Sequence, residues 1–84
     1  MNTVMLLLAT YEHPLIPLET VGKDFLGLGK REVNEQAARN ALPFPVIRLT
    51  ESCKSPRFVR VADLAEHIDR QAELAGISWH RSKI

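Results

Sequence analysis

Residues 17–45 read PLETVGKDFLGLGKREVNEQAARNALPFP, and the order of elements within this stretch decides the fold. Leu18, Val21 and Phe25 are spaced as one apolar stripe of a helix over about residues 18–26. The two glycines that bracket the next leucine predict a tight turn, because glycine adopts a positive φ at little cost. The stretch therefore begins with a short helix followed by a sharp change in chain direction.

A second helix is expected after the glycines, over about residues 30–41. Val33, Ala37 and Ala41 lie four residues apart and form a narrow apolar seam along this helix. Two prolines soon afterwards stop it, because proline lacks the amide hydrogen that an interior helical position needs. The residues that face away from the seam are polar and mostly charged: Lys30, Arg31, Asn34, Glu35 and Arg39.

Beyond the second helix, the sequence predicts a β-hairpin. Two segments rich in β-branched and aromatic residues, about 46–49 and 57–61, flank the polar and turn-forming segment 50–56. Arg48 stands between two apolar residues, so strand alternation places it opposite a buried face. The tip and return strand of the hairpin are basic and carry a hydroxyl group: Lys54, Ser55, Arg57 and Arg60.

The two ends of the chain are less regular. Residues 3–11 are apolar and leave two interpretations open, a short capped helix or a buried strand, and two prolines then predict an extended link. A last helix is expected from Asp63 to Gly76. Its inward-facing residues are Leu64, Ile68, Ala72 and Ala75. Residues 77–84 have no clear element, and we expect Trp79 there to pack against the domain or a second subunit.

These elements predict one small domain. A chain of 84 residues has room for a single hydrophobic core and no more. The expected fold is mainly α with a small β-hairpin wing, a winged helix-turn-helix over residues 1–76 followed by a C-terminal tail at 77–84. In this fold the second helix of the helix-turn-helix enters the major groove of DNA.

The charges are unevenly distributed along the chain, although the net charge is only +1. Residues 44–60 carry four basic side chains and one acid, whereas residues 61–75 carry four acids and one arginine. A basic middle with an acidic flank is typical of a polyanion-binding face, and chance clustering is the alternative. The apolar run at 4–9 is too short to cross a bilayer, and no basic residue precedes it as in a secretory signal. We therefore expect a cytoplasmic protein that does not engage membranes.

No residue pattern indicates catalysis, a metal or a cofactor. The three histidines are scattered and share no metal-ligand spacing with the single cysteine, Cys53. That cysteine has no base near it in sequence, and no disulfide can form within the chain. We expect no enzymatic activity, no metal site and no cofactor.

The predicted helix and wing together favour binding to double-stranded DNA. Lys30 and Arg31 can pair with phosphate or guanine, and Asn34 can make a bidentate contact with adenine. Glu35 can accept from a cytosine amine or turn away. Wing residues usually meet phosphate or the minor groove, and Lys23 is a further candidate for a phosphate contact. The alternative for each element alone is a solvated surface without a partner.

The residues also resemble a known family. Residues 28–45 resemble the recognition helix and proline-containing link of AlpA-like and excisionase-like prophage regulators of the MerR-type winged-helix class. The segments 1–4, 16–28 and 52–70 are similar to the pyocin activator family, and the resemblance extends over about residues 1–71. It implies an activator that binds repeated boxes upstream of phage-tail-like bacteriocin genes. Gly29 departs from this family, since a helix-capping Ser or Thr often stands there.

The sequence therefore predicts a sequence-specific transcriptional activator of phage-derived genes that occupies a promoter element as a dimer or cooperative array. Two other functions remain open. One is an excisionase-like architectural factor that bends DNA, and the other is a protein-interaction module that blocks a regulator. Salt dependence separates the last from DNA binding, because phosphate contacts weaken steeply as salt rises.

Overall fold

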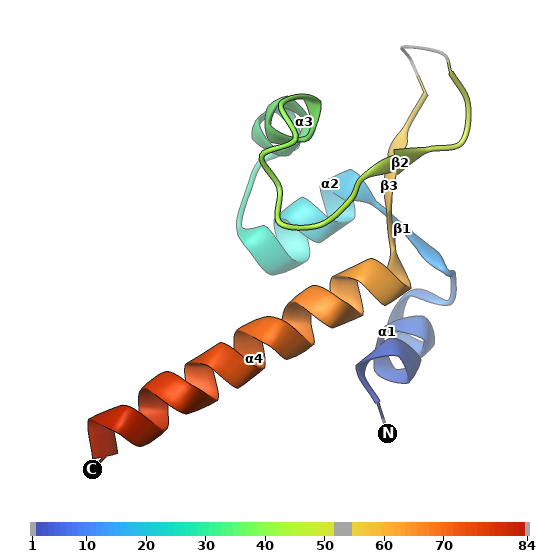
Figure 1. Cartoon of the computed structure of the whole chain (residues 1–84). Helices are drawn as coiled ribbons and strands as arrows, with labels where there is room; N and C mark the ends of the chain where they lie inside the picture. Colours follow the sequence, from blue (N-terminus) through green and yellow to red (C-terminus); the bar gives the residue numbers. More distant parts are fainter. Residues whose placement is uncertain (1, 52–54, 84) are drawn as a thin grey trace.

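The computed structural model of the chain describes residues 2–51 and 55–83, and it is mainly helical with one small sheet, as the sequence predicts (Figure 1). Its elements follow the order α1 (Thr3–Tyr11), β1 (Leu15–Pro17), α2 (Leu18–Val21), η1 (Gly22–Leu26), α3 (Lys30–Ala38), β2 (Ile47–Arg48), β3 (Arg57–Arg60) and α4 (Val61–Lys83). The core draws on nearly all of them: Leu7, Ile16, Leu18, Val21, Val33, Ala37, Phe44, Val59, Val61, Leu64 and Ala65 are buried.

The N-terminal segment is a helix, which settles the choice between helix and strand. The Asn2 side chain caps it by accepting a hydrogen bond of 2.8 Å from the amide of Met5. Leu7 is the buried residue of α1, which packs against α4. Glu12, in the left-handed region, ends the helix with its amide bonded to the carbonyl of Leu8.

Three short strands form an antiparallel sheet in the order β1-β3-β2. The segment expected to be only an extended link contains β1, which pairs Ile16 with Val59 across the sheet. Its terminal proline is tolerated because β1 is an edge strand. β2 and β3 form the predicted hairpin, with Ile47 opposite Phe58 and Arg48 opposite Arg57. Both strands are shorter than the segments predicted for them.

The first predicted helix is continuous over residues 18–26 but changes from α to π geometry at Gly22. Leu18 and Val21 are buried as expected, whereas Phe25 is 42% exposed, contrary to the predicted apolar stripe. The π turn has i→i+5 bonding, so Phe25 is displaced from the stripe that an α-helix would continue. Gly27 follows in the left-handed conformation, at a φ of 67°, and makes the predicted turn.

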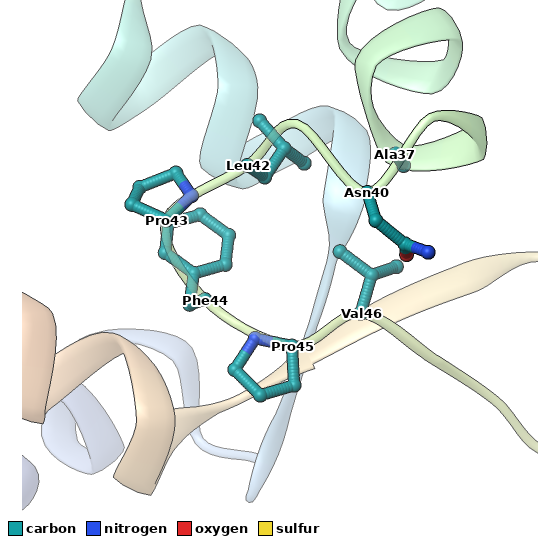
Figure 2. A pocket seen from close by; sticks show the side chains of 7 residues that line it. All are labelled: Ala37, Asn40, Leu42, Pro43, Phe44, Pro45 and Val46. Atoms are coloured by element: carbon teal, nitrogen blue, oxygen red, sulfur yellow. The ribbon is translucent and has the colours of Figure 1, made fainter.

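The second predicted helix is three residues shorter than expected, because α3 ends at Ala38. Asn40 has a φ of 52°, and the amide of Ala41 bonds to the carbonyl of Gln36, a left-handed helix stop. Ala41 is therefore exposed and not part of the apolar seam. The chain then curves around an open hollow of about 290 Å³ (Figure 2), and Phe44 is buried beside the ring of His67.

The C-terminal helix is longer than predicted, because α4 runs through Gly76 to Lys83 and includes most of the predicted tail. A glycine inside a helix costs only about 1 kcal/mol relative to alanine, and no proline follows to stop it. The inward stripe also ends early: Leu64 is buried and Ile68 half-buried, but Ala72 and Ala75 are exposed. Figure 1 shows the distal part of α4 extending away from the other elements.

Candidate nucleic-acid interface

The recognition-helix candidate, α3, is held against the preceding helix by a close approach at Gly22. Val33 is fully buried and Ala37 nearly so, and both lie on the inner side of α3. A Cβ atom on Gly22 would lie 3.0 Å from two atoms of the Val33 side chain. The glycine therefore permits the short distance between η1 and α3, and the opposite side of α3 stays open to solvent.

The basic side chains at the start of α3 are exposed, and each lies close to an acid. The side chains of Lys30 and Arg31 are 78% and 92% exposed. Lys30 Nζ lies 3.9 Å from Glu19 Oε1, and Arg31 Nε donates to Glu35 Oε1 at 3.0 Å. Such exposed pairs contribute little to stability, so a phosphate group can compete for both cations at small cost.

Asn34 joins α3 to the hairpin. Its Nδ2 donates to the carbonyl of Lys30 at 2.8 Å, and its Oδ1 accepts from Arg57 Nη1 at 3.0 Å. Both ends of the amide are thus bonded within the protein. The adenine contact predicted for Asn34 stays a prediction, and in this structure the residue fixes the return strand of the hairpin to α3.

The hairpin presents two arginines on the side of α3. Arg48 and Arg57 are directly opposite each other in the register of β2 and β3, so their side chains leave the same face of the sheet. Because Arg57 reaches Asn34, this face is the one turned towards α3. Arg48 is exposed, but the prediction that it lies opposite a buried face is wrong, because Arg57, its partner in the register, shares its face with the buried Val59. The neighbour Leu49 is 66% exposed and does not form the buried face expected there.

A polar groove of about 380 Å³ lies between α3 and the hairpin. It is lined by Asn34, Ser55 and Arg57, together with Glu19 and the residues beside it at the start of α2. We call this feature the helix–wing groove. Lys54, predicted at the hairpin tip, lies outside the described residues.

Among the predicted site residues that do not line this groove are Arg60, Lys23 and Arg39. Arg60 alternates with Arg57 along β3 and projects from the opposite face of the sheet. Lys23 is exposed on η1, and Arg39 is exposed directly after the last turn of α3. Arg60 forms none of the ion pairs found among the described residues, and Glu66 at the start of α4 pairs with Arg70 at 3.0 Å.

Two residues at this site have roles that sequence reasoning missed. Glu19 lies in the first turn of α2, and its approach to Lys30 depends on how two helices pack. Gly22 carries no side chain, and its need for a close contact with Val33 is visible only in three dimensions. Hydrogen bonds such as that between Asn34 and Arg57, 23 positions apart, likewise leave no local signal.

Comparison with known proteins gives one match, which is to a protein family. Neither curated proteins nor solved structures provide a match to the chain. Among the described helices, none combines the length and apolar character that crossing a membrane requires. The family described as pyocin activator protein PrtN matches residues 3–75, a span that includes α3, the hairpin and most of α4. The chain therefore belongs to the pyocin activator protein PrtN family.

Proposed function

We propose that this protein is a non-catalytic transcriptional activator that binds double-stranded DNA through the exposed side of α3 and the α3-facing side of the hairpin. The family description supports the activating role. The observation that carries DNA binding is the bond of Arg57 to Asn34, because it sets the arginines of the hairpin beside the basic start of α3. Cations on a helix and on an adjacent wing suit a duplex, which offers a groove and a phosphate backbone together.

Within this interface the residues take different roles. Lys30 and Arg31 lie at the N-terminal end of α3, the end that meets base edges in a helix-turn-helix. Arg48 and Arg57 contact phosphate from the wing. Asn34 positions Arg57 and keeps helix and wing at a fixed separation.

The proposed target is a promoter element of phage-derived genes, and the protein acts from the cytoplasm. The excisionase-like alternative uses the same surface but bends its site, so circular-permutation gel shifts distinguish the two functions. A relationship to AlpA-like regulators remains a prediction from the sequence.

The experiment compares two arginines in matched surroundings. Arg31 on α3 and Arg70 on α4 are both exposed, and each donates to a glutamate at 3.0 Å at i,i+4 spacing. Binding of Arg31→Ala and Arg70→Ala to duplex DNA is measured across a salt series. Selected binding sites and random DNA are used in parallel.

We expect Arg31→Ala to weaken binding to the selected sites by about 1–3 kcal/mol and binding to random DNA by less, as the loss of a base-edge contact does. Arg70→Ala should match the parent chain, since Arg70 lies on a different helix from the proposed interface. Equal effects of the two substitutions would reject α3 as the interface. Absence of duplex binding by the parent chain would favour the interaction module that blocks a regulator.

A further inference from the structure

Arg31 and Glu35 form an exposed pair on the open side of α3. Each lies two residues from the fully buried Val33, which places each of them about 160° around the helix from it. Arg31 is in the first turn of α3, the end of the helix that meets base edges in a helix-turn-helix. In the DNA complex proposed above, this pair therefore faces the duplex.

The order of the two residues along the helix does not favour helix stability. A cation in the first turn meets the positive end of the helix dipole, and an acid that follows its cation by four residues is the weaker arrangement of such a pair. The pair of Glu66 and Arg70 on α4 has the opposite and more favourable order. Helix stability therefore does not explain the contact between Arg31 and Glu35.

The atoms used in this contact leave the outer edge of the Arg31 guanidinium free. Glu35 Oε1 accepts a hydrogen bond from Arg31 Nε at 3.0 Å. Within residues 2–51 and 55–83, Nη1 and Nη2 of Arg31 have no hydrogen-bond partner, and the side chain is almost fully exposed. These two nitrogens form the planar fork that donates two parallel hydrogen bonds to O6 and N7 of guanine. Arg31 can therefore bind a guanine edge while it keeps its bond to Glu35.

The carboxylate of Glu35 affects the two kinds of DNA contact differently. A phosphate is an anion, and it gains less from a guanidinium that is already paired with a carboxylate than from a free one. The acceptor atoms of guanine carry no net charge, so their contact with the fork loses less when Glu35 is present. The bond at Nε also fixes the plane of the guanidinium before binding, which reduces the entropy that the contact costs. Glu35 thus favours a base contact of Arg31 over a phosphate contact.

We propose that Arg31 reads a guanine in the DNA target of this protein and that Glu35 is the residue that positions Arg31. These roles rest on the DNA binding proposed above and add the identity of one base pair. They assign Glu35 to Arg31, whereas the sequence left open a contact of Glu35 with a cytosine amine. Arg57 differs from Arg31, because it bonds to the uncharged amide of Asn34 and its charge stays available to phosphate.

Binding-site selection tests the role of Arg31. Selection with the parent chain identifies the preferred base pairs, and the same selection with Arg31→Ala shows which position depends on Arg31. We expect a G·C pair at that position, preferred by about 5–150-fold, the range for one bidentate contact. Arg31→Lys should lose most of this preference, because an ammonium group lacks the planar fork. A different base pair at the Arg31-dependent position, or no such position, would overturn the role of Arg31.

Substitutions at Glu35 test its positioning role. Glu35→Ala should reduce the preference for the G·C pair and strengthen binding to random DNA. The slope of log affinity against log salt on random DNA should steepen by about 0.9, because the released guanidinium gains a phosphate contact. Glu35→Gln keeps an oxygen that accepts from Arg31 Nε, so it should retain most of the preference while binding to random DNA still rises.

Glu66→Ala is the matched control, because Glu66 accepts from Arg70 at the same distance of 3.0 Å on an exposed part of α4. This helix stays open to solvent further on, where Trp79 is 57% exposed and the expected packing of Trp79 against its own domain is not observed. Glu66→Ala removes one negative charge away from the proposed interface, so it measures the effect of net charge alone.

The outcomes distinguish this inference from the function on which it rests. Equal behaviour of Glu35→Ala and Glu66→Ala, with the preference for the G·C pair retained, would overturn the positioning role of Glu35. A parent chain that binds duplex DNA without an Arg31-dependent G·C pair would reject the inference alone. A parent chain that binds no duplex DNA would reject the proposed function and the inference together.

Discussion

At the scale of single residues, Gly22 sets how closely α3 approaches the helix before it. A Cβ atom at position 22 would lie only 3.0 Å from the Val33 side chain. Val33 is fully buried, so its side chain cannot move aside into solvent. Gly29 presents the opposite case, since a Cβ atom there would meet nothing within 4 Å and its φ of −71° suits any residue. The two glycines therefore respond differently to substitution.

Gly22→Ala should destabilise the protein by about 1–3 kcal/mol, because an added methyl group overpacks a closed core. Gly29→Ser is the control and should stabilise by a few tenths of a kcal/mol, since α3 has no side-chain cap and serine provides one. Urea denaturation followed by circular dichroism measures both values. A Gly22→Ala variant as stable as the parent chain would show that η1 and α3 separate freely.

At the scale of elements, α4 combines a core helix with an exposed arm. Leu64 is 1% exposed and Ile68 only half-buried, so burial decreases along the helix within one turn. Leu64→Ala should cost about 2–5 kcal/mol, as in other fully buried leucine sites. Ile68→Ala should cost about 1 kcal/mol in the monomer, since only part of its side chain leaves water on folding. Urea unfolding of the two variants at low protein concentration provides the comparison, and equal losses would contradict the observed burial.

Elements were predictable where local chemistry determines them. The apolar spacing of Val33 and Ala37 predicted α3, and the two prolines after it predicted approximately where the helix ends. The turn at Gly27 was predictable because it needs a positive φ, which glycine adopts at little cost. Tertiary contacts decided the remainder. β1 exists only because Ile16 pairs with Val59 on a distant strand. The continuation of α4 through Gly76 is the exception and has a local reason, because one glycine costs a helix only about 1 kcal/mol and no proline follows it.

The candidate site was predictable in its composition but not in its connections. Lys30 and Arg31 are exposed, as the alternation of polar and apolar residues indicates. Arg57 and Arg60 project from opposite faces of the sheet. Which face each one takes follows from the strand register, and the segment that joins the two strands does not predict that register. The pairing of Asn34 with Arg57 depends on the distance between α3 and the hairpin, a property of the assembled fold.

At the scale of the whole molecule, Tyr11 connects the N-terminal helix α1 to η1, the helix against which α3 packs. Its hydroxyl donates to Asp24 Oδ2 at 2.8 Å, and its ring lies 6.2 Å from that of Phe25. Burial raises the pKa of Tyr11 above 10.0, and the hydrogen bond to Asp24 and the charge of that carboxylate act in the same direction. Folding therefore favours the neutral phenol.

This pKa shift predicts a loss of stability at high pH. Below pH 10 the phenol is neutral in both states and its contribution is fully present; as pH rises through the raised pKa of the folded state, the contribution is lost. Tyr11→Phe should remove this component, so the stability difference between the variant and the parent chain should change above pH 10. Tyr11 is the single tyrosine, so its absorbance reports the pKa directly. An ordinary pKa in the folded protein would contradict the hydrogen bond between Tyr11 and Asp24.

For the DNA binding proposed above, the bond between Asn34 and Arg57 also limits how the specificity of this protein can evolve. In the proposed DNA-binding function, a substitution at position 34 that gained a base contact would at the same time release the hairpin from α3, because the Asn34 amide bonds to Lys30 at one end and to Arg57 at the other. A substitution at position 34 therefore loses the contact between α3 and the hairpin, unless a second substitution at position 57 restores it. Homologues with different DNA preferences should vary at these two positions together, and lineages that keep both residues should have diversified through Lys30 and Arg31 instead.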